Sequence, residues 1–107
     1  MIWLLCLPGL LRAGQEQKGQ DEEVKKLYAL NCAVCHASDG SANTAMGKEL
    51  KADDLRSHKV QKESDHELYD FIAKGKKKMP GFEKKLEKDQ IWRLVAYLRT
   101  LAERPSR

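Results

Sequence analysis

The segment NCAVCH, residues 31–36, brings two cysteines and a histidine together in a chain of 107 residues. Cys32 and Cys35 are three positions apart, and His36 follows directly. Two thiols at this spacing can add to the two vinyl groups of a haem, and the adjacent imidazole can then bind the iron as an axial ligand. The motif therefore predicts a covalently attached haem c, with His36 on the metal.

Other uses of two nearby cysteines have to be weighed against this one. A thioredoxin-like dithiol normally belongs to an α/β fold, and no useful strand-like alternation occurs in this sequence. A structural zinc site needs four ligands, and His58 and His66 do not form a paired motif with matching spacing. A plain disulfide would use the same two cysteines, and it is the alternative that stays open.

An amphipathic helix leads into the motif, and we expect Asp21 to cap it. Its apolar face consists of Val24, Leu27, Tyr28 and Cys32. After the motif the periodicity is weak. Gly40 and Gly47 are expected to mark turns, and a short helical turn is expected around Leu55. The sequence thus places the motif between a helix and a long irregular segment.

Two further helices are predicted in the C-terminal half. Ser64 and Glu67 match a capping box, and that helix should stop at Gly75. The last helix should be capped by Asp89 and end before Pro105. Its apolar stripe consists of Ile91, Leu94, Val95, Leu98 and Leu101. The predicted fold class is therefore all-α.

The first fourteen residues differ from the rest of the chain. Residues 2–11 are almost entirely apolar, too few to span a bilayer but typical of the apolar part of a secretory signal, with Ala13 or Gly14 at the cut. No basic residue precedes this run, so the sequence as given can start downstream of the true N-terminus. We expect a signal peptide over residues 1–14, a disordered linker over 15–20 and one domain over 21–104. No stable membrane insertion is expected after cleavage, and retention of the leader as an anchor is the alternative.

Three segments together resemble the small single-haem class I cytochromes c of bacteria: CAVCH, KKKMPGF and the terminal IWRLVAYLRTLA. The resemblance covers residues 21–104. It implies a cytochrome c fold, in which three to four helices surround one covalently attached haem. It also implies that Cys32 and Cys35 form the thioethers and that His36 is the proximal iron ligand. The implied activity is electron carriage, with no substrate turned over, so the protein is not expected to be an enzyme.

The resemblance also supplies a distal iron ligand, Met79, in the Met-Pro pair formed with Pro80. Met79 lies 43 residues after His36, in a loop long enough to reach the opposite face of a haem. A methionine thioether favours reduced iron and raises the reduction potential. The alternatives are Met46, only ten residues after His36, and a bis-histidine iron that uses His58 or His66. In alkaline solution Lys78 can replace the sulfur.

Two departures from the family concern the surroundings of the motif. Val24 stands where the family often has a glycine in the first helix, opposite Tyr97, so a wider helix crossing or a shifted aromatic ring is expected. The family also commonly has a proline in the loop after the histidine. No proline lies between His36 and Met79, so the sequence does not identify the backbone carbonyl that orients the other nitrogen of His36.

A set of lysines surrounds the Met-Pro pair: Lys74, Lys76, Lys77, Lys78, Lys84 and Lys85. One interpretation is a loop kept soluble by its charge. The other is a positive ring that steers the protein to an acidic patch on a redox partner and raises the association rate. The export signal and the lack of interleaved aromatic residues argue against nucleic acid as the partner.

Taken together, the sequence predicts a monomeric single-haem cytochrome that carries one electron between redox partners in the periplasm. Two alternatives remain. One is a haem enzyme or a gas or peroxide sensor whose sixth coordination site opens. The other is a fixed electron-transfer subunit of an oxidase or dehydrogenase.

Overall fold

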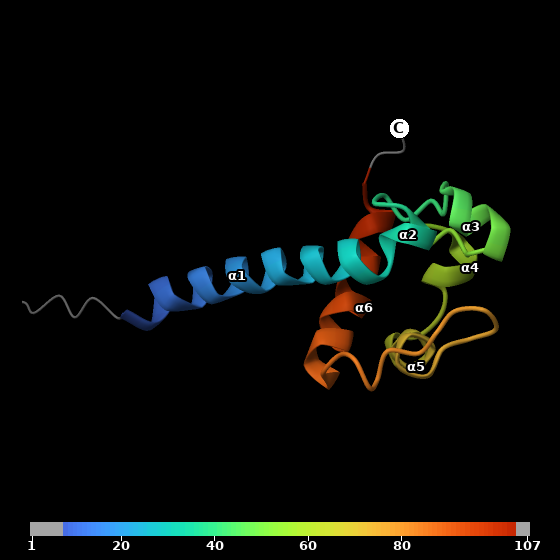
Figure 1. The fold of residues 1–107 in the computed structure, drawn as a ribbon. Helices are drawn as coiled ribbons and strands as arrows, with labels where there is room; N and C mark the ends of the chain where they lie inside the picture. The colour runs from blue at the N-terminus through green and yellow to red at the C-terminus, as the bar shows by residue number, and fades with distance from the viewer. Residues whose placement is uncertain (1–7, 105–107) are drawn as a thin grey trace, which may run out of the picture.

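The computed structural model describes residues 8–104, with side chains from residue 14 onward. Within this part the chain forms only helices, turns and one isolated antiparallel bridge between Lys76 and Met79, so the predicted all-α class is confirmed (Figure 1). The helices are α1 Pro8–Asn31, α2 Ala33–His36, α3 Ala45–Leu50, α4 His58–Gln61, α5 Asp65–Lys74 and α6 Lys88–Ala102. None of them is both long and apolar enough to cross a membrane.

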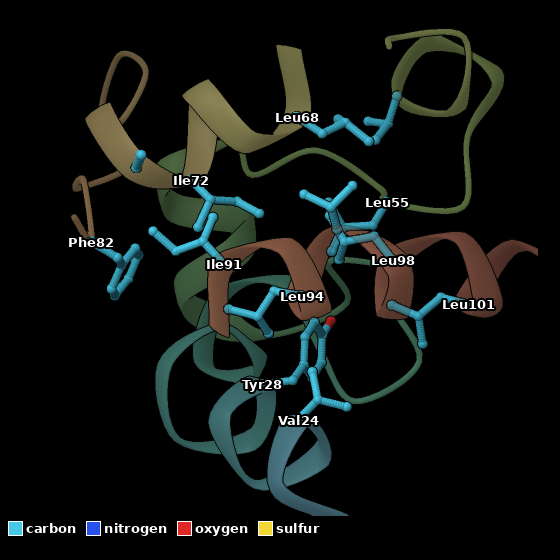
Figure 2. Close-up of a cluster of buried hydrophobic side chains, with 13 residues drawn as sticks. Val24, Tyr28, Leu55, Leu68, Ile72, Phe82, Ile91, Leu94, Leu98 and Leu101 are labelled. Atoms are coloured by element: carbon cyan, nitrogen blue, oxygen red, sulfur yellow. The ribbon is translucent and has the colours of Figure 1, made fainter. Parts of the chain in front are cut away.

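The core forms around α6, which packs between α5 on one side and α1 on the other (Figure 2). All five residues of the predicted apolar stripe are buried, and Leu101 is completely so. Burial of each such side chain stabilises the fold by about 1.5–3 kcal/mol. The other buried apolar residues are Val24, Tyr28, Leu55, Val60, Leu68, Ile72, Ala73 and Phe82.

Helix α1 is longer than the sequence analysis predicts. Residues 15–20 are helical rather than a disordered linker, and Asp21 lies inside the helix rather than at its cap. The reason is local, because this stretch is rich in Gln, Glu and Lys, which are good helix formers, and Pro8 occupies the first helical position, where its missing N–H costs nothing. The side chain of Gln17 also donates a hydrogen bond to Asp21 at 3.1 Å. Figure 1 shows α1 projecting from the rest of the molecule. Residues 1–7 of the predicted signal peptide lie outside the described residues.

The middle segment is more ordered than predicted. Gly40 does form a turn, with φ at 85°, but Gly47 lies in α3 and is buried. Leu55 is buried in a turn, and the short helix follows it as α4. Thr44 caps α3 by accepting from the Gly47 N–H, and Ser57 caps α4 in the same way. Both α3 and α4 therefore begin at a hydroxyl N-cap, and apolar periodicity in the sequence does not predict either helix.

The boundaries of α5 and α6 follow the predictions with one exception. Ser64 and Glu67 form the predicted capping box of α5, which ends at Gly75. Helix α6 begins after Glu87, whose N–H donates to the side chain of Gln90 at 2.8 Å, whereas the predicted cap Asp89 pairs with Arg93. Pro105, the expected end signal, lies outside the described residues. Residues 75–87 form the loop between the two helices, and it contains the Met-Pro pair.

Candidate functional site

Cys32, Cys35 and His36 are held together on the short helix α2 and its N-cap. The Cys32 N–H donates to the carbonyl of Tyr28 at 2.8 Å, so the motif continues directly from α1. The His36 N–H donates to the carbonyl of Cys32 at 2.9 Å, which closes one helical turn. All three side chains are partly buried. Two thiols and an imidazole therefore project from a single turn of backbone.

The Cys32 thiol is not suited to dithiol redox chemistry. Burial, and to a smaller extent the neighbouring Cys35, raise the pKa of Cys32 to about 11. Cysteines that exchange disulfides have a lowered pKa, because the thiolate is the nucleophile. The structure therefore adds a second argument against a thioredoxin-like use of the motif. Both cysteines are free thiols in the structure.

The imidazole of His36 has one nitrogen fixed by the backbone. Its Nδ1 atom lies 2.9 Å from the carbonyl oxygen of Asp53. A carbonyl only accepts hydrogen bonds, so this contact selects the tautomer that carries its proton on Nδ1 and leaves a lone pair on Nε2. The sequence could not identify this carbonyl, and the structure assigns it to Asp53. A histidine oriented in this way is suited to binding a metal through Nε2.

Tyr28 fixes the end of the motif from the side of the core. Its hydroxyl donates to the carbonyl of Ala37 at 2.6 Å, and burial raises the pKa of Tyr28 well above its usual range. Its ring contacts Tyr97 of α6, with centroids 5.1 Å apart. Val24 is buried on the same helix as Tyr28, and α1 packs on α6.

Met79 lies on the 75–87 loop and is partly buried against the core. Its N–H donates to the carbonyl of Lys76 at 3.0 Å, and the Lys76 N–H donates back at 3.1 Å. These bonds close a tight turn in which Lys77 has a positive φ of 55°. This loop joins α5 to α6, whereas the cysteine motif follows α1, so Met79 and the motif come from different parts of the chain (Figure 1).

The alternative iron ligands lie in more open positions. Met46 on α3 is 41% exposed. His58 is exposed, and so is His66, which lies 3.5 Å from Asp70. Within the described side chains, no cluster of three or more His, Cys, Asp or Glu residues could hold a metal ion. Of the two described methionines, Met79 is the one that packs against the core.

The residues of the site fit a covalent haem. Two free thiols and a histidine with an available Nε2 match the donor set, and a macrocycle also needs an apolar wall. Partly buried apolar side chains occur near the cysteines in the chain, at Leu27 and Ala33, and in the loop at Met79 and Leu86, and all four pack against the core.

Sequence reasoning did not identify two groups near the motif, the carbonyl of Asp53 and the Thr44 side chain that caps α3. A backbone acceptor leaves no residue-type signal, so Asp53 could not have been found. Thr44 could have been noticed, because a threonine ahead of a short segment is a common N-cap.

Comparisons with known proteins give a consistent result. The profile of a family described as "Cytochrome C oxidase, cbb3-type, subunit III" matches residues 19–98. Cytochrome c6 from Leptolyngbya boryana is 33% identical over 79 residues, which cover 74% of this chain and 89% of the relative. Cytochrome c6 from Anabaena variabilis is 32% identical over 78 residues, which cover 73% of this chain and 87% of the relative. A solved structure, "KustC0563 c-type cytochrome", aligns with a TM-score of 0.66 and 32% identity over 72% of this chain and 94% of that one.

Proposed function

Because this chain belongs to the cytochrome c family, we propose that it carries single electrons between redox proteins in the periplasm through one haem c. The family match confirms the resemblance found in the sequence. The relatives are cytochromes, so the chain is a c-type electron carrier and not an enzyme. The periplasmic location rests on the apolar leader at residues 1–14.

We assign the thioethers to Cys32 and Cys35, the proximal iron bond to Nε2 of His36 and the distal bond to the sulfur of Met79. When bound, the haem supplies an iron that can be reversibly oxidised and reduced by one electron. The observation that carries the assignment is the contact between His36 Nδ1 and the Asp53 carbonyl at 2.9 Å. A histidine with one nitrogen fixed by the backbone presents the other in a constant direction, which a permanent ligand requires.

The surroundings of these residues favour a closed carrier. Met79 is partly buried and is held by two backbone hydrogen bonds to Lys76. A ligand fixed in this way can stay bound in both oxidation states, so little has to rearrange when an electron moves. The thioether favours reduced iron and the apolar side chains around it limit access of water. The alternative of a sensor with an opening sixth site therefore has less support.

The lysines around Met79 support a partner with an acidic docking patch. Each of the six is exposed. The ammonium of Lys76 lies 4.4 Å above the ring of Phe71, and that of Lys85 lies 6.0 Å from the ring of Phe82. Positive charge gathered on the end of α5 and the loop after it raises the rate of encounter with an acidic surface more than it raises affinity.

Optical spectroscopy of the haem-loaded protein tests the ligation. Reduced protein should show a sharp c-type α band, and oxidised protein should show the weak near-infrared band of a sulfur-to-iron bond. A high-spin, five-coordinate spectrum at neutral pH would refute Met79 as a ligand. The assignment of electron carriage would fail if reduced protein bound carbon monoxide rapidly, because a closed iron site should resist it.

A second candidate is a fixed electron-transfer subunit of an oxidase. It is favoured by the description of the matching family as subunit III of a cbb3-type oxidase. Affinity purification of the chain from its native membranes distinguishes the two candidates. A diffusing carrier should elute alone at moderate salt, whereas a subunit should elute with a constant ratio of oxidase polypeptides.

A further inference from the structure

The short helix α2 leaves carbonyl groups that need partners from outside it. A helix of four residues cannot satisfy its own C-terminal carbonyls. The carbonyl of Ala33 accepts from the N–H of Ala37 at 2.9 Å, and the carbonyl of His36 accepts from the N–H of Ala42 at 2.8 Å. The carbonyl groups of Val34 and Cys35 lie between those of Ala33 and His36 in the chain.

The hydroxyl of Thr44 reaches both of these carbonyls. Its Oγ1 atom lies 2.8 Å from the carbonyl oxygen of Val34 and 3.0 Å from that of Cys35. The same oxygen accepts the N–H of Gly47 at 2.8 Å. A hydroxyl has one proton to donate and two lone pairs. Because Gly47 occupies a lone pair, the proton is directed to the carbonyls of α2.

The beginning of α3 is pressed against the same carbonyl groups. A Cβ atom at Gly47 would overlap the carbonyl oxygen of Cys35 and crowd that of Ala42. Only glycine lets the backbone of α3 approach this closely. Thr44 therefore joins α2 to α3 at a close backbone contact, where a side chain on Gly47 would not fit.

We propose that Thr44 is a positioning residue for His36, acting through the carbonyl groups of Val34 and Cys35. The carbonyl of Cys35 belongs to the peptide group that joins it to His36, so holding it fixes the backbone orientation of His36. The Asp53 carbonyl then fixes the ring. This inference rests on the proposed role of His36 as an iron ligand. Under this inference, two contacts set the direction of the imidazole: Thr44 holds the backbone before His36, and the Asp53 carbonyl holds the ring.

The variant Thr44→Asp separates this role from simple capping. An ionised aspartate accepts the N–H of Gly47 and is a good N-cap, but it has no proton to donate to the carbonyls of α2. Residue-resolved amide exchange by NMR on the haem-loaded protein is the measurement. In Thr44→Asp the N–H of Gly47 should stay protected. The N–H groups of Ala37 and Ala42 keep their acceptors, the carbonyls of Ala33 and His36, but should exchange roughly fivefold to tenfold faster, because the turn that they close loses the stabilisation of the Thr44 hydrogen bond. The Nδ1–H signal of His36 should shift.

Two further variants serve as controls. Thr44→Ser keeps donor and acceptor and should restore wild-type exchange. Ser57→Asp makes the same exchange of a hydroxyl cap for a carboxylate at α4, where the cap accepts from Val60, and should leave Ala37, Ala42 and the His36 signal unchanged. Equal behaviour of Thr44→Asp and wild type at Ala37 and Ala42 would overturn the inference and leave Thr44 as a cap only.

The outcomes also separate this inference from the proposed function. If Thr44→Asp accumulates no haem-loaded protein, Thr44→Val is compared with Ser57→Ala, since both lose a cap. Faster exchange at Ala37 in Thr44→Val alone supports the positioning role, and equal exchange refutes it. If wild-type protein lacks a haem spectrum, the proposed function fails before any variant is measured.

Discussion

The Nδ1 atom of His36 lies 2.9 Å from the carbonyl oxygen of Asp53, seventeen residues further along the chain. The segment that carries this carbonyl is itself fixed by the backbone. The N–H of Ala52 donates to the carbonyl of Gly47 at 2.8 Å, and that of Leu55 donates to the carbonyl of Gly40 at 2.7 Å. The loop after the motif is thus a scaffold that reaches back to orient the imidazole.

Replacing Tyr28 with Phe should lower stability in a pH-dependent way. The change removes the hydrogen bond to Ala37 and should cost about 1 kcal/mol at neutral pH. Burial raises the pKa of Tyr28 in the folded protein, so its contribution is fully present below the unfolded pKa of about 10 and is lost as the pH rises further. Denaturant unfolding at several pH values checks this.

In that series the difference between wild type and Tyr28→Phe should be constant up to about pH 9 and shrink above about pH 10. Tyr97→Phe, from the same pair of rings, is the matched control. A difference that persists unchanged to the highest pH would show that the Tyr28 hydroxyl is not buried as described.

Replacing Met79 with Ala should lower the reduction potential, because the thioether that favours reduced iron is lost. A change on the order of 0.1 V is expected, a fraction of the range of about 0.8 V that axial ligands set. Protein-film voltammetry measures the potential, and carbon monoxide binding reports the opened site. Met46→Ala is the control and should leave both unchanged, since Met46 lies on the exposed side of α3. The opposite pattern would move the distal ligand to Met46.

Replacing Arg99 with Ala should destabilise the fold by about 2–3 kcal/mol. Its guanidinium joins α6 to the end of α4, the start of α5 and the link between them. It donates to the carbonyls of Gln61 at 2.9 Å and Glu63 at 2.6 Å and to the carboxylate of Asp65 at 2.8 Å. Lysine should not rescue the loss, because it lacks the planar fork that serves several acceptors. Thermal unfolding with a denaturant series checks both variants.

Arg93 provides the comparison for Arg99. Its side chain is similarly exposed, at 28% against 29%, but within residues 14–104 its ion pairs are with the surface carboxylates of Glu23 and Asp89. Arg93→Ala should therefore cost less than about 1 kcal/mol. Similar losses for the two variants would contradict the assigned role of Arg99.

Replacing Lys77 and Lys78 with Gln should slow electron transfer to an anionic oxidant several-fold at low ionic strength. The change removes positive charge from the loop that carries Met79, and such charge steers encounters. Stopped-flow measurements should show the difference vanish near 1 M salt, where the screening length is about 3 Å. The control removes Lys18 and Lys25, which are exposed on α1. If both double variants slowed electron transfer equally, the net charge of the protein, and not the position of the lysines near Met79, would explain the effect.

Those elements whose signal is local were predictable from the sequence. The stripe on α6, the capping box of Ser64 with Glu67 and the stop at Gly75 each follow from neighbouring residue types, and the structure confirms them. The cysteine motif and its helix were likewise predicted in place. The ligand roles of His36 and Met79 stay predictions.

The differences arise where polar groups, rather than apolar periodicity, determine the structure. α3 and α4 are short and begin at hydroxyl caps, so they bury too few apolar side chains to show a period. Residues 15–20 are helical but exposed, so backbone propensity contributes more to their helix than apolar burial does. The contact of His36 with Asp53 depends on the path of the backbone between these two residues, which cannot be read from the residue types.

The central claim is that a haem is bonded through sulfur to Cys32 and Cys35. The most direct test is the mass of protein exported by cells with a cytochrome c maturation system, measured together with its visible spectrum. The predicted result is a coloured protein whose mass exceeds that of the polypeptide cut after Ala13 or Gly14 by one haem, with no such increase in the Cys32→Ser, Cys35→Ser double variant. A colourless wild-type protein with the mass of the bare polypeptide would contradict it.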